Sequence, residues 1–161
     1  MKGNWRIRIL AVLLAVTAIG AAWAGIERYQ KAHRKTEAEI ISLYPDTRGV
    51  LAAQLPEGAL FTFSWPERDA GLFDPGQIGP GTLLELTSPD YWLYSSPMQL
   101  PGVSAVKVTG QRGDFVALHY DTLCASYAQG GAAQLEAAVN ALDQLNAGEK
   151  NGLLYLIRGM A

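Results

Sequence analysis

The sequence predicts an α+β protein in which a long N-terminal helix, a membrane segment with an amphipathic extension, precedes a small, mainly antiparallel sheet and one further helix. Three observations predict this class. An uncharged apolar run lies near the N-terminus, strand-sized stretches come after it, and residues 131–146 carry a leucine stripe at helical spacing. Most links between the strand-sized stretches are too short for a crossover helix, which favours antiparallel neighbours. The length of 161 residues suits one ordinary domain, which we place at 46–161.

Composition and charge exclude several classes of protein. The hydrophobic fraction of 49% and the charged fraction of 17% exclude wholesale disorder. Residues 1–45 carry seven basic and three acidic side chains, whereas 46–161 carry six basic and twelve acidic ones. Such an acidic domain is a poor electrostatic match for nucleic acid, so we expect no nucleic-acid partner. A single cysteine and two histidines leave little material for a metal centre, and we expect no cofactor.

The first element is a short basic N-terminal tail, 1–8, followed by eighteen uncharged residues from Ile9 to Ile26. As a helix this run would be about 27 Å long, close to the ~30 Å hydrocarbon core of a bilayer. Trp5 and Trp23 lie near its ends, where indole rings favour the membrane interface. We therefore predict a transmembrane helix over 9–26, with the lipid bilayer as its partner.

Two alternatives remain for this run. The basic start, the apolar stretch and Ala22-Trp23-Ala24 before Gly25 also fit a signal peptide that is cleaved after Ala24. A buried helix of a soluble protein would have to be covered on every side. Basic residues flank the run almost equally, which leaves the topology open. We expect the domain at 46–161 to be extracytoplasmic, because an anchor and a signal peptide both export the chain on their C-terminal side.

Residues 27–44 predict a juxtamembrane helix. The stretch has no Pro or Gly, is rich in helix-forming residues, and places apolar side chains such as Ile40 at helical spacing. It stops before Pro45, because the residue before a proline is disfavoured in the α region. We expect one continuous helix from Ile9 to about Leu43, whose C-terminal half covers the sheet. His33 is interpreted as a solvated surface residue.

Six later stretches have the length of strands, and several alternate large apolar with small or polar residues. A loop rich in Gly and Pro over 69–81 separates the first from the second. Two stretches around the turn Gly110–Gly113 are the best hairpin candidate. The expected strands are 59–65, 82–87, 91–95, 103–109, 114–120 and 153–157.

The further helix is expected over 131–146. Leu135, Val139, Leu142 and Leu145 fall on one stripe, which predicts core packing, with a partner groove as the alternative. Gly148 suits the end of a helix. The link from 120 to 153 is long enough to place the last strand parallel to the strand before it.

The search for catalytic residues gives one weak constellation. His119 and Asp121 precede Cys124, and a thiol nucleophile needs an adjacent base and a group that orients the base. Free cysteines are more often buried, so we interpret Cys124 as a structural thiol, with an intermolecular disulfide as the alternative. The run Gly76–Gly81 lacks the Lys-Ser/Thr of a phosphate loop, and Arg112-Gly113-Asp114 is interpreted as turn chemistry. We assign no catalytic, cofactor-binding or metal residue.

The N-terminal stretch has a short basic leader ending in Gly3, then the apolar run, then Tyr29-Gln30 continuing toward the domain. In this layout it resembles a type IV pilin or pseudopilin. The run VKVTGQRGDFVALHYDTLCASY is loosely similar to the strand-to-cysteine region of type IVb pilins. The resemblance implies a helix that is half membrane anchor and half packed on an antiparallel sheet. The chain departs from the family where Arg8 replaces its glutamate, where its mid-helix proline is absent, and in having one cysteine.

These observations lead to one functional hypothesis and two alternatives. We expect a non-catalytic, single-pass component of a bacterial envelope assembly, such as a type IV pilus or a secretion system. It would reside in the inner membrane with a periplasmic C-terminal domain, and would contact other envelope-assembly proteins rather than a small-molecule substrate. The alternatives are a periplasmic or secreted binding module released after Ala24, and a small membrane-tethered enzyme that uses His119 and Cys124.

Overall fold

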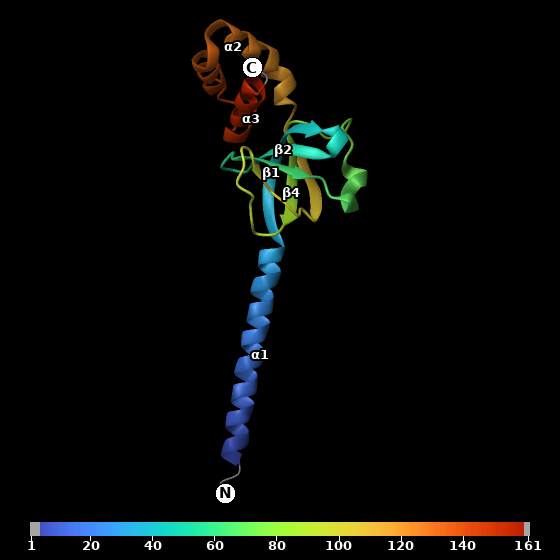
Figure 1. Cartoon of the computed structure of the whole chain (residues 1–161), viewed down its shortest axis with the longest axis vertical. Coiled ribbons are helices and arrows are strands. Elements are labelled where there is room, and N and C mark those ends of the chain that lie inside the picture. Colours follow the sequence, from blue (N-terminus) through green and yellow to red (C-terminus); the bar gives the residue numbers. More distant parts are fainter. Residues whose placement is uncertain (1–3, 160–161) are drawn as a thin grey trace.

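The computed structural model describes residues 4–159, with the side chains of 14–31 and 33–159. The leader residues that end in Gly3 lie outside this range. The α+β class is confirmed: a helix at the N-terminus, a six-stranded sheet and further helices. Figure 1 shows α1 projecting from one end of the body, with α2 and α3 at the other end. The helices and strands are α1 (Asn4–Ala32), β1 (Arg34–Tyr44), β2 (Gly49–Gln54), β3 (Leu60–Ser64), β4 (Thr82–Ser88), β5 (Met98–Gln99), β6 (Ala105–Gln111), α2 (Phe115–Asn140) and α3 (Ala147–Arg158).

The helix expected over 27–44 is wrong beyond Ala32, because Arg34–Tyr44 is strand β1. Its side chains alternate between the two faces of the sheet: Thr36 and Ile40 are buried on one face, and Glu39 on the other. Both edges of β1 are paired, one with β2 and the other with β4. Two ladders and two buried faces outweigh the helix propensity of the stretch. The segment that was expected to cover the sheet as a helix is therefore a central strand of that sheet.

The sheet has the order β5-β3-β2-β1-β4-β6 and is antiparallel except for the pair β3–β5. The strands expected at 59–65, 82–87 and 103–109 are confirmed as β3, β4 and β6. The stretch 91–95 is not a strand and forms only an isolated bridge between Leu93 and Gln99. Strands β2 and β5 are not anticipated by the sequence.

The expected hairpin is wrong because 114–120 begins helix α2. Asp114 is the N-cap residue: its Oδ1 accepts a hydrogen bond from the backbone N–H of Ala117 at 2.8 Å. Gly113, with φ of 119°, supplies the turn between β6 and the helix. Phe115 and Leu123 are then buried in the hydrophobic cluster that α2 forms with α3 and the sheet. A capped helix with a buried face thus replaces the second hairpin strand.

The strand expected at 153–157 is also wrong, and so is its parallel pairing, because this apolar run lies in α3. Helix 131–146 is confirmed only as far as Asn140, as the second half of α2 after a break at Gly131. Leu135 and Val139 are fully buried, which confirms core packing for that part of the stripe. Within residues 4–159, two α-helices thus follow the sheet where one was expected.

Two hydrophobic clusters lie on opposite faces of the sheet. On one face, Phe61, Phe63 and Trp65 pack with residues of β1, β4 and β6 under loops that contribute Ile78 and Leu100. On the other face, residues of β1 and β2 pack against α2 and α3. Helices therefore cover part of one face, over β1, β2 and β3, and loops cover the other face.

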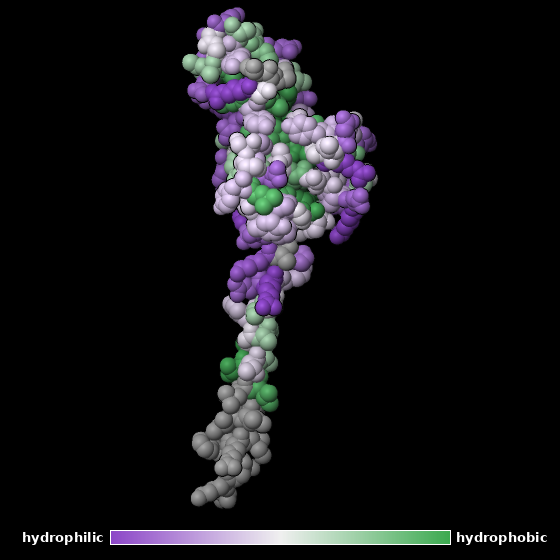
Figure 2. Space-filling view, in the orientation of Figure 1, coloured by the Kyte–Doolittle hydropathy of each residue, from purple (hydrophilic) through white to green (hydrophobic). Residues whose placement is uncertain are grey.

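The neck between α1 and the body is formed by Lys31, His33, Arg34 and Asp90. Only His33 separates α1 from β1, and its Nδ1 lies 2.9 Å from the carbonyl oxygen of Tyr29. The backbone N–H of Asp90 donates to the carbonyl of Lys31 at 2.8 Å, and the Asp90 carboxylate pairs with Arg34. Figure 2 shows polar side chains at the neck and apolar ones further along α1. These contacts join the end of α1 to the body.

Candidate functional site

The most unusual group of side chains lies where α3 meets the sheet. Glu39 of β1 is fully buried, and its Oε2 accepts a hydrogen bond from Asn146 Nδ2 at 2.7 Å. Arg112 Nε lies 4.0 Å from Glu39 Oε1 and 3.5 Å from Glu149 Oε1. We call Glu39, Arg112, Asn146 and Glu149 the acidic cluster. It joins β1, the end of β6 and the start of α3.

Local backbone structure positions each member of the acidic cluster. Asn146 and Glu149 form a capping box: Glu149 N–H donates to Asn146 Oδ1 at 2.9 Å, and Asn146 N–H to Glu149 Oε2 at 2.6 Å. The backbone N–H of Arg112 donates to the carbonyl of Gly81 at 2.8 Å, just after β6. Glu39 is fixed by the paired strand that carries it. The cluster is therefore preorganised.

Burial raises the pKa of Glu39 to about 7, because the charged carboxylate is removed from water. The hydrogen bond from Asn146 acts against this rise, the nearby Glu149 adds to it, and Arg112 acts against it. Glu39 Oε1 is buried without a hydrogen-bond partner as an acceptor. When Glu39 is protonated, it can donate that proton to the carboxylate of Glu149. The arrangement thus keeps Glu39 neutral below about pH 7.

A small cavity of about 230 Å³ adjoins the acidic cluster. This volume is below the ~300–1,000 Å³ typical of small-molecule sites. Glu39 itself does not line it, so this buried carboxyl has no access to a ligand there. Glu39 and Asn146 therefore link β1 to the start of α3, while Arg112 and Glu149 also face the cavity. The cavity is lined by Arg112, Gly113, Asp114, Phe115, Leu118, His119, Gln144, Leu145 and Glu149.

The structure separates the residues of the weak catalytic constellation. Cys124 lies five positions after His119 on α2, which turns the two side chains about 140° apart around the helix axis. His119 Nε2 lies 3.5 Å from Gln144 Nε2, whereas Cys124 packs beside Tyr120 against the helical core. Asp121 is exposed. His119 therefore does not serve as a base for this thiol.

Cys124 is half-buried rather than fully buried. Replacing it by serine places a hydroxyl against apolar neighbours, so we expect Cys124→Ser to lower the free energy of unfolding by about 1 kcal/mol. Ala125→Ser, at an exposed position of the same helix, is the matched control and should change it little. Urea unfolding of both variants measures the difference, and equal stabilities would contradict a packing role for the thiol.

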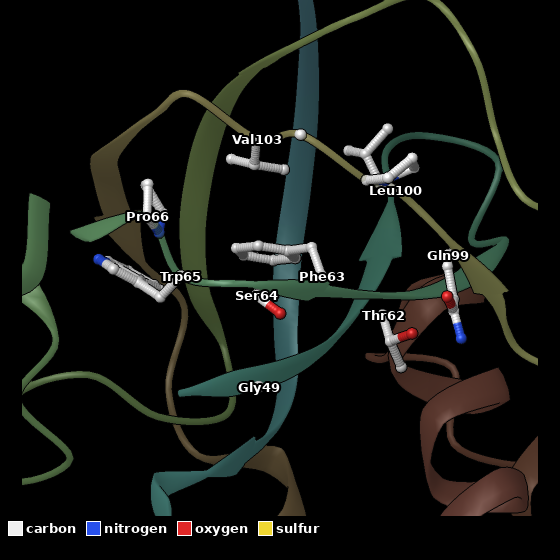
Figure 3. Close-up of a pocket in the computed structure, with 11 residues that line it drawn as sticks. Gly49, Thr62, Phe63, Ser64, Trp65, Pro66, Gln99, Leu100 and Val103 are labelled. Atoms are coloured by element: carbon white, nitrogen blue, oxygen red, sulfur yellow. The ribbon is translucent and has the colours of Figure 1, made fainter. Parts of the chain in front are cut away.

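A second concave region is an open groove of about 570 Å³ at the outer side of β3. Strand β5 pairs only with Phe61 and Thr62, so the last residue of β3, Ser64, is exposed beyond it. Figure 3 shows Phe63 in the middle of this groove, with Trp65 and Pro66 to one side. Trp65 is held in place by its indole N–H, which donates to the carbonyl of Asp69 at 2.9 Å. The groove has no titratable side chain in its lining.

The sequence predicted no functional residue, and the acidic cluster was missed. Arg112 and Asp114, interpreted as turn residues, are an ion-pair partner and a helix cap. Among residues 14–159, apart from position 32, no three metal-ligating side chains gather. Within the same described residues, no helix is long and apolar enough to cross a membrane. Comparison with family models, curated proteins and solved structures gives no match to this chain.

Proposed function

We propose that the chain is a non-catalytic, single-pass component of a bacterial envelope assembly of the pilus or secretion-system kind. In this proposal α1 anchors the protein in the inner membrane and the body extends from it into the periplasm. The observation that carries the proposal is α1 itself, a 29-residue helix that projects from the body without packing on it. The pilin resemblance of the N-terminal stretch supports the kind of assembly.

The exposed side chains of α1 are not covered by any other part of the chain that the structure describes. Leu14, Val16, Ile19, Trp23 and Ile26 are 56–72% exposed. Four of them fall within an arc of about 80°, and Leu14 lies elsewhere, about 160° from Val16. The other sides of the helix over 14–26 carry exposed alanines, glycines and Thr17, with no charge. A partner helix would cover one stripe, whereas a bilayer covers all sides. The uncharged run starts at Ile9, and the side chains of 9–13 lie outside the described ones.

Two observations support a non-catalytic role. His119 and Cys124 point to different sides of α2, and Glu39 is fully buried. Under this proposal the body acts through its surface, and the groove beside β3 is a suitable place for a protein partner. The groove is open and is lined by both apolar and polar groups. An extended segment of a protein partner could place its side chains against the apolar groups and hydrogen-bond the polar ones.

Membrane anchoring is tested by one charge in the apolar run. We expect the native chain to sediment with membranes and to resist extraction by high salt, because apolar burial is not screened by salt. Val16→Arg should shift the protein toward the soluble fraction, since arginine at a helix centre opposes insertion by about 2.5–3.5 kcal/mol. Fractionation and immunoblotting measure the shift.

Gln30→Arg is the matched control, because it adds the same charge to the same helix beyond the apolar run; it should remain in the membrane fraction. Release of the native chain by salt alone would overturn the anchor. Mass spectrometry of the mature N-terminus separates the alternatives: a chain starting at Gly25 indicates a released periplasmic module, and one starting at Asn4 indicates pilin-like processing.

A further inference from the structure

The groove beside β3 has no charged side chain in its lining. Its walls come mainly from two uncharged stretches of the sequence, 58–66 and 91–106. The domain around the groove is charged, with six basic and twelve acidic side chains over 46–161. Depletion of charge next to Phe and Trp side chains is typical of the core of a protein–protein interface. A charged ligand would lose water here without gaining an opposite charge, so the groove suits an uncharged one.

The edge of β3 is open where it borders the groove. The backbone N–H of Trp65 donates toward β2, to the carbonyl of Arg48 at 2.8 Å, and successive residues of a strand direct their backbone groups to alternate sides. The N–H and C=O of Ser64 therefore point away from β2, to the side on which the carbonyl of Thr62 accepts a hydrogen bond from the N–H of Leu100 at 2.9 Å. Among residues 4–159, no strand pairs with Ser64 on that side, because the pairing with β5 ends at Thr62. The edge thus offers one donor and one acceptor to a further strand.

Both sides of the groove are fixed by packing within the body. Figure 3 shows Leu100 and Val103 on one side of Phe63 and Ser64 on the other. Phe63 is 5% exposed, and its ring stacks on that of Trp65 at a centroid distance of 6.2 Å. A ligand that fills the groove therefore has few side chains to order, which keeps the entropic cost of binding low.

Two features decide which occupant the groove suits. A helix uses its backbone N–H and C=O groups internally, whereas an extended segment has them free to pair with Ser64. A second copy of this chain would have to offer a free strand, and the far edge of the described sheet is β6. That strand carries Lys107, and its Val106 N–H already donates to Asp69 Oδ2 at 2.7 Å. An uncharged extended segment of a different protein therefore fits the groove better than a second copy does.

We propose that the groove beside β3 binds an uncharged, extended segment of another envelope-assembly protein, which pairs with the backbone of Ser64 and packs on Phe63. For the kind of partner this inference rests on the proposed function. In this mode of recognition, main-chain hydrogen bonds to a sheet edge supply affinity, and the pocket beside the edge selects the side chains. Because the lining is uncharged, apolar and small polar side chains are accepted and charged ones are excluded.

The test pans a phage-displayed library of random heptapeptides against the full chain in dodecyl maltoside. Enriched peptides should be depleted in charged residues relative to the library. Two pairs of variants then locate the binding of the synthesised peptides, which fluorescence anisotropy measures. Val103→Glu places a charge on the groove wall, and Val108→Glu, on β6 and outside the lining, is the matched control. Ser64→Pro removes the free N–H, and Ser64→Ala keeps it. Circular dichroism first confirms that each variant is folded.

Val103→Glu and Ser64→Pro should each weaken peptide binding about tenfold or more, whereas Val108→Glu and Ser64→Ala should leave it within about twofold. If Ser64→Pro does not fold, the Val103 and Val108 variants decide alone. The proposal is overturned by no enrichment, by enriched peptides rich in charge, or by equal effects of Val103→Glu and Val108→Glu.

Sedimentation equilibrium tests the alternative occupant. A native dimer that Val103→Glu dissociates would make a second copy the occupant and overturn the proposal. Failure of the anchor is a separate result, because a native chain that salt releases from membranes can still bind the selected peptides. Loss of peptide binding, in turn, leaves the membrane sedimentation of the native chain unchanged.

Discussion

Raising the pH from about 4.5 to above 7 is expected to remove about 3 kcal/mol of stability through Glu39 alone. In the folded chain the pKa of this buried carboxyl is about 7, against 4.5 for the free group. Between these values the folded state holds more protons than the unfolded state, so the free energy of unfolding falls as pH rises. The loss is complete above pH 7, and 2.5 pKa units correspond to about 3 kcal/mol.

Glu39→Gln removes the ionisation and keeps the shape of the neutral side chain. Its amide can still accept from Asn146 and donate where the protonated carboxyl would, toward Glu149. We expect it to match the native chain near pH 4 and to exceed its stability by about 3 kcal/mol near pH 8. Denaturant unfolding over this pH range measures the difference between the two proteins.

Glu37→Gln is the matched control, since Glu37 lies two positions away on the same strand and is exposed. It removes the same charge without changing the buried cluster, so its stability relative to the native chain should not vary with pH in this way. A Glu39→Gln difference that is constant from pH 4 to pH 8 would mean that folding does not raise the pKa of Glu39, and the account of the cluster would then be wrong.

The elements that could be predicted are those in which apolar residues recur with a single clear period along the sequence. Strand β4 alternates buried and half-buried residues along its whole length, and this period of two is visible in the sequence. Residues 34–44 carry two signals, helix-forming residue types and an alternation through Thr36, Ala38 and Ile40. Only the ladders on both sides of β1, which depend on distant segments, decide between them.

The two stretches that were wrongly predicted as strands, 114–120 and 153–157, each follow residues typical of a helix start. Asp114 stands where an N-cap is needed, and Asn146 with Glu149 has the spacing of a capping box. A short apolar run such as 153–157 does not distinguish a buried strand from a buried helix by its period. The capping box that precedes this run was the more informative feature.

The acidic cluster could not be predicted in the same way. Glutamates are almost never fully buried unless they are paired, so the residue type gives no reason to expect a buried Glu39. Its hydrogen-bond partner, Asn146, is 107 positions away in the sequence. Such a contact exists only after β1 has become the centre of the sheet and α3 has docked on it.

Gly152→Val is expected to lower the free energy of unfolding by about 3 kcal/mol, the upper end for overpacking a core. Gly148 and Gly152 lie one turn apart on α3 and let its backbone approach the sheet closely. A Cβ at 152 would lie 2.5 Å from Ile41 Cγ2, and one at 148 would lie 2.5 Å from Ala53 Cβ. Either contact forces α3 away from β1 and β2.

A double-mutant cycle separates this contact from a general effect of losing glycine. Ile41→Ala alone should cost about 2–5 kcal/mol by leaving a cavity. Combined with Gly152→Val, it should cost less than the sum of the two single changes, because the valine then fills space that Ile41 vacates. Gly71→Val is the matched control, since nothing lies within 4 Å of a Cβ there, and it should change stability little. Thermal and urea unfolding measure the four proteins of the cycle and the Gly71→Val control. Strict additivity of Ile41→Ala and Gly152→Val would show that α3 does not rest on β1 through this pair.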